Sequence, residues 1–495
     1  MSLMFIDSVI FACIVLLILQ CRRKTGSRRL PPGPKPLPVI GNLHLLGDKP
    51  HVSLTKLSKA YGPLMSLKLG QVTAIVLSSS EMAKEILQTH DRVFSSRAVP
   101  DAVAALNLNV HEMTWLEVSD KWRNLRKIGN KYIVSTAKLE AGQDLRRKKV
   151  QDLLQEVGKC CQDGKAVDIA QASFRTTLNL LSNTFFSMDL ADTSSENARE
   201  FRDVVKAIMD VVGKPNLSDH FPVLRFLDPQ GIRRQTGVLC KKLLDIFDRI
   251  SDERLRSRRK TDQSSTKSDV LDTLLDIAED KNVDFDLDAI RYLFLELFTA
   301  GNDTTSSTLE WAMTELLRNP KAMSRAREEL RENIGVGNTV EESDTSRLPY
   351  LHAIIKETFR LHPPAPFLIP RKSGSDVEIN GFVIPKGATI LINAWAIGRD
   401  PKIWENPEEF MPERFLDSDT DFRGSNFRLI PFGGGRRICP GLPLATRMLH
   451  LMLGSLIHSF EWEVEEKEYL GVEEDFGITL HKARALRALP VRFTS

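Results

Sequence analysis

The chain carries PFGGGRRICPG at residues 431–441, directly before the apolar stretch Leu442–Leu456. Three consecutive glycines let the backbone turn tightly and approach a flat ligand. Backbone N–H groups at the start of a helix lower the pKa of a nearby thiol and so favour its thiolate. A cysteinate held in this way can bind heme iron and promote cleavage of dioxygen. Cys439 is therefore the leading candidate for a metal ligand.

Two other interpretations of Cys439 stay open from these residues alone. The thiol could be an ordinary buried cysteine, or the glycines could form a phosphate-binding loop. No Gly-Lys-Ser or Gly-Lys-Thr follows the glycines, so the phosphate loop fits poorly. Arg437, two residues before the cysteine, can pair with a carboxylate.

Composition describes a large chain with almost balanced charge. Its 495 residues are 42% hydrophobic, which is ample for a large core. Length alone suggests about three or four domains, although residues 40–495 contain no strong linker. The net charge of +3, from 68 basic and 65 acidic residues, gives no argument for nucleic-acid binding. The cysteines form no Cys-x-x-Cys pair, so neither a zinc site nor a disulfide framework is indicated.

The N-terminus has the features of a membrane anchor. Val9–Leu19 is an unbroken apolar run, and a basic cluster at residues 22–29 follows it. An apolar helix of about 20 residues crosses a bilayer, and the basic side stays cytosolic. A cleaved signal peptide is the alternative, but there the charges precede the apolar run. We expect an anchor at residues 1–21, a basic and proline-rich linker at 22–38, and a cytosolic domain at 39–495.

The rest of the chain shows strand patterns near its start and helical patterns in its middle. Two strands joined by a turn at Gly70-Gln71 are expected within residues 63–78, and Asn380-Gly381 predicts a hairpin turn within residues 374–396. The longest expected helix is Leu287–Leu317, which Pro320 ends and which Asp286 or Asp288 caps.

The centre of this helix reads AGNDTTSS at residues 300–307. These residue types are poor in helix interiors, so the sequence predicts a weakened or bulged turn, as is typical of functional sites. Thr304 offers a hydroxyl that can bond dioxygen, and Asp303 offers a proton source. Together they suit a proton relay. The alternative is a kinked helix with a solvated Asp.

Two further groups of residues have meaningful spacing. Glu357 and Arg360 share a helix face, and Arg414 downstream could complete a buried Glu–Arg–Arg network. Trp122 and Arg126, spaced i,i+4, could direct an indole N–H and a guanidinium at one anion, with Arg371 as a further cation. Taken singly, each could equally be a core tryptophan or a surface charge.

In this order along the chain, the motifs resemble the cytochrome P450 superfamily from Pro31 to Ser495. The pattern Phe-x-x-Gly-x-Arg-x-Cys-x-Gly is complete at residues 432–441. The resemblance implies one mainly α-helical domain with small β-sheets. It also implies heme b with iron bound by Cys439, a monooxygenase activity, and Asp303 and Thr304 as catalytic residues. The residues implied to hold the cofactor are Trp122, Arg126, Arg371, Phe432, Arg437 and Cys439.

The sequences at residues 300–313, 393–400 and 476–480 are similar to the geraniol 8-hydroxylase group of plant microsomal members. That likeness implies anchoring in the endoplasmic reticulum membrane, with membrane lipid as a partner, and oxidation of a terpenoid, with a monoterpenol such as geraniol ahead of sesquiterpenes and diterpenes. Asn302 departs from the group, which often has Thr there. The implied substrate contacts are Ala300, Phe367, Leu368, Ile369 and Ile478.

Electrons for such an enzyme must come from outside, because the chain has no Rossmann or flavin fingerprint. The resemblance implies the membrane-bound NADPH–cytochrome P450 reductase, with NADPH acting only through it. Basic residues around Lys121–Lys131, with Arg436, could dock an acidic partner or could be ordinary surface residues. Two other functions stay open: an oxygen-independent heme enzyme and a heme-based ligand sensor.

Overall fold

The structure is a computed structural model that describes residues 29–191, 196–260, 269–280 and 282–493. Its helices are α2 (Pro50–Tyr61), α3 (Ser80–Lys84), α4 (Asp120–Tyr132), α5 (Thr136–Ala141), α6 (Gln143–Asp163), α7 (Ile169–Phe186), α8 (Glu196–Val212), α9 (Leu217–His220), α10 (Ile232–Lys260), α11 (Val270–Glu279), α12 (Leu287–Arg318), α13 (Pro320–Ile334), α14 (Pro349–Leu361), α15 (Ala394–Ile397) and α16 (Leu442–Ser459). The expected fold class, mainly α-helical with small sheets, is confirmed.

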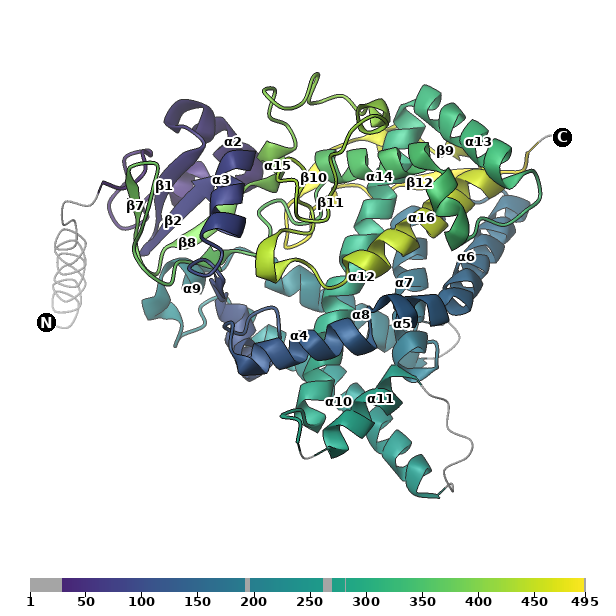
Figure 1. Cartoon of the computed structure of the whole chain (residues 1–495), viewed down its shortest axis with the longest axis horizontal. Helices are drawn as coiled ribbons and strands as arrows, with labels where there is room; N and C mark the ends of the chain where they lie inside the picture. The colour runs from purple at the N-terminus through teal and green to yellow at the C-terminus, as the bar shows by residue number, and fades with distance from the viewer. Residues whose placement is uncertain (1–28, 192–195, 261–268, 281, 494–495) are drawn as a thin grey trace, which may run out of the picture.

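The strands form small sheets at the N-terminal end of the molecule, near its middle and near its C-terminal end (Figure 1). The largest sheet has the order β1-β2-β8-β5-β3, and its strands are β1 (Leu64–Leu69), β2 (Val72–Leu77), β8 (Thr389–Ile392), β5 (Arg371–Lys372) and β3 (Ser96–Arg97). A second sheet orders β4 (Val167–Asp168), β12 (Arg487–Val491) and β9 (Glu461–Val464), while β10 (Glu474–Asp475) pairs with β11 (His481–Lys482) and β6 (Val377–Ile379) with β7 (Phe382–Ile384).

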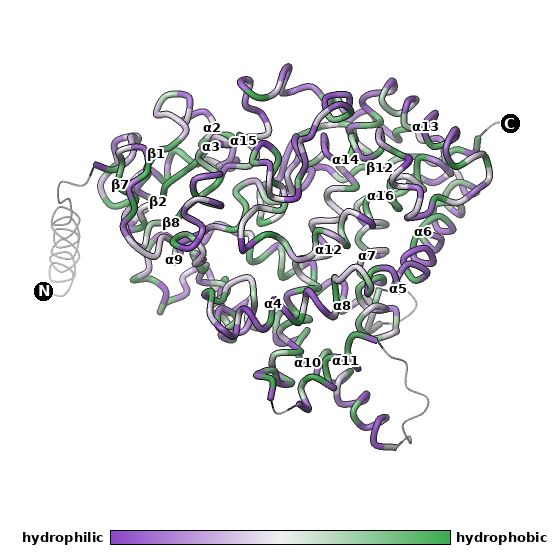
Figure 2. Tube along the Cα trace, in the orientation of Figure 1, coloured by the Kyte–Doolittle hydropathy of each residue, from purple (hydrophilic) through white to green (hydrophobic). Residues whose placement is uncertain are grey.

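Both predicted turns connect antiparallel strands. Leu69 pairs with Val72 across the Gly70-Gln71 turn, and Ile379 pairs with Phe382 across Asn380-Gly381. Asn380 and Gly381 both have positive φ, at 51° and 75°, which is the backbone conformation that a two-residue hairpin of this sequence requires. Figure 2 shows that β1, β2 and β8 are rich in hydrophobic residues, whereas α6 and α13 are largely hydrophilic on the outside of the molecule.

Helix α12 runs through the middle of the molecule and contacts α7, α8, α10, α14 and α16 (Figure 1). Asp286 caps it by accepting a hydrogen bond from the backbone N–H of Ala289 at 2.8 Å, as one of the two predicted caps. Its first half, Ile290–Phe298, packs in one hydrophobic cluster and its last part, Leu309–Leu316, packs in another. The polar segment at residues 300–307 therefore lies where α12 passes from one core to the other.

The predicted bulge in α12 is wrong, because the helix continues without interruption across residues 300–307. The hydroxyl groups explain this: Thr304, Thr305 and Thr308 each donate to the backbone carbonyl four residues earlier, at 3.0, 2.9 and 2.8 Å. Such bonds satisfy these three hydroxyl groups inside the helix, so the groups do not require a break in it.

The predicted membrane anchor, residues 1–21, and all of the basic cluster except Arg29 lie outside the described residues. Among the residues that are described, no helix combines the length and the apolar character needed to cross a bilayer. The proline-rich segment of the expected linker is extended, and Pro32 accepts a hydrogen bond from the N–H of Ser66 at 2.9 Å. This segment is therefore fixed against strand β1.

Candidate functional site: a cysteine loop facing the centre of α12

The loop before α16 is built by glycines in conformations that other residues rarely adopt. Gly433 and Gly435 have φ values of 72° and 66°. A Cβ atom on Gly435 would come within 2.2 Å of the carbonyl oxygen of Leu87. The N–H of Cys439 donates to the carbonyl of Phe432 at 3.0 Å, which closes the loop just before the helix begins. The glycine run thus presents Cys439 at the N-terminus of α16.

The thiol of Cys439 is half-exposed and lies among groups of opposing effect. Burial raises the pKa of the Cys439 thiol, whereas the N–H groups of Gly441 and Leu442 and the charge of Arg126 act to lower this pKa. A bound cation would add the positive charge needed to hold the sulfur as a thiolate. These surroundings suit a metal-bound sulfur better than a structural cysteine in a sealed core.

The middle of α12 borders an open space. Ala300 is exposed and Thr304 is half-exposed, although Phe298, Asn302 and Thr305 around them are buried. Residues four apart lie on one face of a helix, so this face is not covered by packed side chains. Glu296, one turn earlier, contributes to the electrostatic environment of Cys439. The exposed face of α12 and the cysteine loop therefore belong to the same region.

Arginines gather beside this region without enough acids to balance them. Burial, together with their mutual repulsion, lowers the pKa values of Arg97, Arg371 and Arg437, to about 10 for the last two. Asp91 and Glu296 are the acids that act on them. Arg126 is half-buried and forms no hydrogen bond or ion pair with the residues that the structure describes. Buried cations without matching anions fit the two propionates of a heme group.

Arg97 is a member of this cluster that sequence reasoning missed. It lies on β3, and its register places it opposite Arg371 on β5. Its guanidinium donates to the carbonyls of Thr114 at 3.1 Å and Ile369 at 2.8 Å. Nothing local in the sequence marks Arg97, because the strand that aligns it with Arg371 comes from a distant part of the chain.

Trp122 and Arg437 are placed differently from the sequence expectation. The indole N–H of Trp122 donates to the carbonyl of Met113 at 3.1 Å, and Arg437 donates to the same carbonyl at 2.9 Å. Arg437 also stacks 4.9 Å above the Trp122 ring and donates to Ser95 and Leu116. These two residues fix the loop around Met113, whereas Arg126 of the predicted pair makes no hydrogen bond or ion pair with the described residues.

The predicted Glu–Arg–Arg group comes together beneath the cysteine loop. Arg360 donates to both oxygens of Glu357, at 2.6 and 2.8 Å, and Arg414 donates to one of them at 3.0 Å. Phe359, next to Arg360, packs edge-on against Phe432 with the ring centres 5.1 Å apart. The network thus supports the start of the loop that carries Cys439.

The predicted substrate residues are spread around the region. Leu368 has a positive φ of 54° and lies over the cysteine loop, 3.9 Å from the position of a Cβ on Gly433. Phe367 packs against Phe476 with the ring centres 5.9 Å apart. Ile478 lies beside Gly213 and is 38% exposed. Ile369 contributes its carbonyl to Arg97. Ala300 and Leu368 are thus the members with the most direct relation to the cysteine loop and α12.

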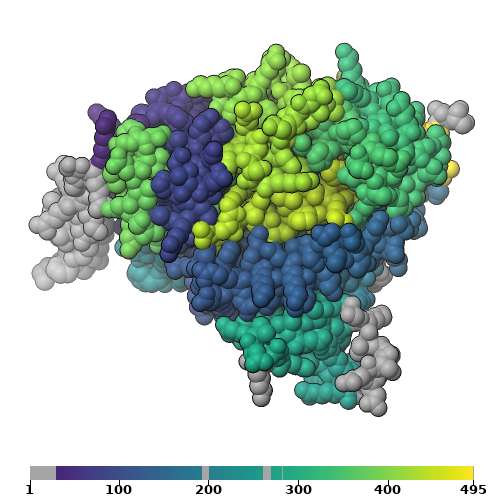
Figure 3. Space-filling view, viewed as in Figure 1, coloured from purple at the N-terminus to yellow at the C-terminus, as the bar shows by residue number. Residues whose placement is uncertain are grey.

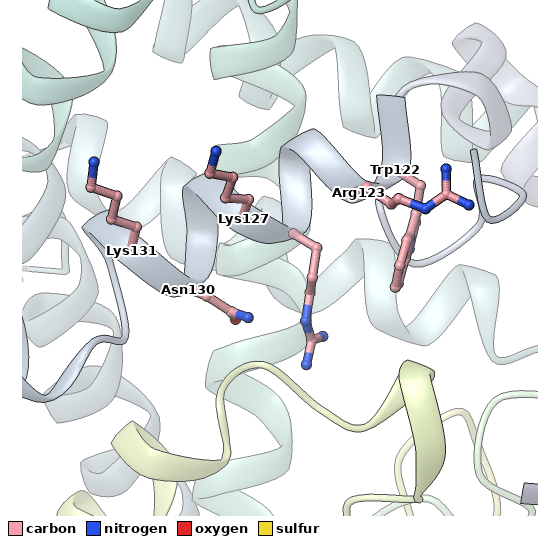
Figure 4. A pocket seen from close by; sticks show the side chains of 6 residues that line it. Trp122, Arg123, Lys127, Asn130 and Lys131 are labelled. Carbon is pink, nitrogen blue, oxygen red and sulfur yellow. The ribbon is translucent and has the colours of Figure 1, made fainter. Parts of the chain in front are cut away.

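The basic side of α4 lies next to the C-terminal half of the chain. Figure 3 shows the segment containing α4–α6 (blue) directly against the C-terminal region (yellow-green). Arg123, Lys127 and Lys131 are exposed along α4, and a shallow pocket of about 490 Å³ lies among them and their neighbours. Figure 4 shows Lys127 and Lys131 projecting from the same side of the helix.

Comparison with known proteins agrees with this geometry. The Cytochrome P450 family model matches residues 31–486. The chain is 54% identical to a geraniol 8-hydroxylase of Catharanthus roseus over 467 residues, covering 94% of each chain. It is 52% identical to a geraniol 8-hydroxylase of Swertia mussotii, again with 94% of each chain covered. It is 48% identical to a drimenol monooxygenase of Persicaria hydropiper, with 97% of this chain and 96% of the relative covered.

The match spans the cysteine loop, the centre of α12 and the arginine cluster together. Such coverage extends far beyond a shared motif and includes the elements that position the site. The chain belongs to the cytochrome P450 family, and it is a monooxygenase whose cofactor is a heme held by a thiolate.

Proposed function

We propose that this protein hydroxylates an apolar terpenoid, with a monoterpenol such as geraniol as the favoured substrate, and that Cys439 supplies the thiolate. The observation that carries the proposal is that Cys439 shares its electrostatic surroundings with the open face of α12, which bears Ala300 and Thr304, with the buried Asp303 next to Thr304. The overall reaction consumes substrate, O2, NADPH and a proton and yields the alcohol, NADP⁺ and water. When bound, the heme would supply the activation of O2 and the insertion of one of its oxygen atoms into a C–H bond, while the other atom leaves as water.

The chain's own residues would bind the cofactor and deliver protons to the ligand on the open face. Arg97, Arg126, Arg371 and Arg437 would balance the propionates, with Trp122 and Phe432 packed around the loop. The hydroxyl of Thr304 now donates to Ala300 at 3.0 Å, a bond that it can exchange for one to a ligand on the open face. Asp303, next to it, would renew the proton that Thr304 passes on.

An apolar substrate fits the side chains around this face. The side chains expected to contact the substrate carry no charge and would bind hydrocarbon: Ala300, Phe367, Leu368, Ile369 and Ile478. The shape of the site would then decide which carbon is oxidised. Two relatives that cover 94% of this chain are named geraniol 8-hydroxylases, which favours a monoterpenol. The drimenol monooxygenase at 48% identity makes a sesquiterpenoid alcohol the second candidate.

Attachment to the endoplasmic reticulum membrane would come from residues 1–21, with 22–38 as a stiff connection and 39–495 as a cytosolic domain. Support comes from exposed apolar side chains that adjoin the β1–β2 turn: Leu37, Val39 and Ile40 on one segment, and Leu217, Val223, Phe226 and Leu227 on another. Gly41 bridges to Leu69, and Gln71 donates to the carbonyl of His220 at 2.8 Å, so both segments lie at this one end. Their combined apolar surface suits contact with lipid.

Electrons would arrive from NADPH–cytochrome P450 reductase at the basic side of α4. Arg123, Lys127 and Lys131 are exposed there and would attract an acidic flavin-bearing partner. Arg436 is less available for this role, because its guanidinium pairs with Asp91.

A substrate panel tests the proposal. Microsomes containing the full chain and the reductase are supplied with NADPH and, separately, geraniol, drimenol and a diterpene, and the products are identified by mass spectrometry. We expect NADPH-dependent hydroxylation of geraniol at the highest kcat/KM. Turnover of the diterpene alone would reject the monoterpenol assignment, and no oxygenated product from any substrate class would reject a terpenoid hydroxylase.

A further inference from the structure

The carboxylate of Asp303 has a specific partner, His481 on strand β11. Asp303 is 6% exposed, and its Oδ2 lies 3.1 Å from Nε2 of His481 on β11. The side chain of His481 is 37% exposed, whereas that of Asp303 is 9% exposed. The imidazole therefore connects a buried carboxylate, adjacent to Thr304, with the exterior of the packed core.

Several contacts with α12 hold His481 in place. The carbonyl of Leu480, the preceding residue, accepts from Ser307 Oγ at 2.8 Å and from Trp311 Nε1 at 3.3 Å. The N–H of Leu480 donates to the carbonyl of Pro364 at 2.8 Å, and His481 itself pairs with Asp475 on β10. Asp303, Ser307 and Trp311 are spaced along one side of α12, so the strand runs against the same helix face that presents the carboxylate.

Acidic groups surround the imidazole from more than one element. Asp303 and Glu310 act on it from α12, and Asp210 acts from α8, while Asp475 is its neighbour across the strand pair. Burial alone would lower the pKa of His481, but the hydrogen bond to Asp303 and the three carboxylates outweigh burial and raise this pKa. Burial also raises the pKa of Glu310, to about 7. The surroundings of His481 therefore favour its protonated form more than water does.

We propose that His481 is the positioning residue for Asp303, and that it returns a proton to this carboxylate during each turnover. The inference rests on the role of Asp303 put forward under the proposed function. In the step, the Nε2–H bond of the imidazolium breaks and an O–H bond forms on Oδ2 of Asp303. The imidazole is left neutral with its remaining proton on Nδ1, and Nε2 then regains a proton from bulk water. No electrons are transferred.

Chemical modification tests the pairing without measuring catalysis. Diethyl pyrocarbonate acylates neutral imidazole, so its reaction rate at His481, followed by peptide mass spectrometry across pH, reports the protonation of that side chain in the holoenzyme. We expect the half-point of the His481 profile above pH 6.5 in the wild type and at a lower pH in Asp303→Asn. His90, with a 32% exposed side chain 3.6 Å from Glu85, is the matched control whose profile should not change. An unshifted His481 profile would overturn the pairing.

Coupling of NADPH oxidation to product tests the proton return. His481→Gln can keep a hydrogen bond to Asp303 but cannot carry a proton, so we expect coupling to fall about tenfold and to lose its decline at alkaline pH. His90→Gln should behave as wild type, and an unchanged heme spectrum confirms that each variant is folded. If His481→Gln couples normally while Asp303→Asn does not, the role of His481 is rejected. If Asp303→Asn also couples normally, the proposed role of Asp303 fails instead.

Discussion

Arg360 and Asp303 are both buried charged side chains on helices, but their surroundings differ. The guanidinium of Arg360, in a residue that is 1% exposed, donates all five of its N–H groups: to the two oxygens of Glu357 and to the carbonyls of Gly398, Pro407 and Glu409. Asp303 instead bonds to His481, which reaches the exterior. A closed network fixes structure, whereas an open one can exchange protons. In this protein, therefore, the Arg360 network has a structural role and the Asp303–His481 pair has a role in proton transfer.

The closed network should show the largest effect on stability. Glu357→Ala leaves the charges of Arg360 and Arg414 without their carboxylate, which costs about 3–5 kcal/mol of unfolding free energy. Urea denaturation of the purified protein measures it. Glu408→Ala is the matched control, because Glu408 also pairs with an arginine, at 3.2 Å, but has a 72% exposed side chain. Equal destabilisation by the two variants would refute the closed-network interpretation.

Glu310 is intermediate between Arg360 and Asp303. Its side chain is buried, and one of its oxygens accepts a hydrogen bond from the N–H of Leu486 at 2.7 Å. Burial raises the pKa of Glu310 from 4.5 to about 7. The folded protein therefore binds this proton more tightly, and the associated stability is present below pH 4.5 and lost as pH rises through 7. Glu310→Gln has no ionising group and keeps this stability, so we expect its free energy of unfolding at pH 8 to exceed that of the wild type by about 2–3 kcal/mol.

The pH dependence of this gain is the decisive observation. Thermal unfolding of wild type and Glu310→Gln at pH 5 and pH 8 measures it, and the advantage of the variant should shrink at pH 5. A constant difference at both pH values would show that Glu310 does not titrate in this window.

A substitution on the exposed face of α12 should change the coupling of NADPH oxidation to product and hardly change the free energy of unfolding. Thr304→Ala removes the hydroxyl on the exposed face of α12, so product formed per NADPH should fall about tenfold, with the electrons appearing in hydrogen peroxide. The change in unfolding free energy should stay below about 1 kcal/mol. Thr308→Ala removes a hydroxyl with the same bond to the preceding turn, at 2.8 Å, but a buried one, and coupling should survive there.

Local sequence signals predicted the parts of the site that depend on neighbours in the chain. The spacing of Glu357 and Arg360, the cap at Asp286 and the glycine loop before Cys439 all follow from residues a few positions apart. The bulge predicted in α12 is wrong, because intrinsic propensities do not include the hydroxyl–carbonyl bonds that satisfy polar side chains inside the helix.

Two contacts across long sequence separations could not be predicted from local patterns, unlike the Glu357–Arg414 pair. Arg97 joins the arginine cluster only because β3 pairs with β5, and His481 reaches Asp303 only because the β10–β11 pair lies along α12. Nothing in either local sequence specifies its partner, since register between distant segments is set by packing of the whole fold.

If Cys439 provides the thiolate, the absorption spectrum of the reduced, CO-bound protein will show it. Thiolate ligation gives a strongly red-shifted Soret band. We predict this band for the wild type, its loss in Cys439→Ser, and its retention in Cys240→Ser, a buried cysteine distant from the loop in sequence. An unchanged red-shifted band in Cys439→Ser would contradict the account.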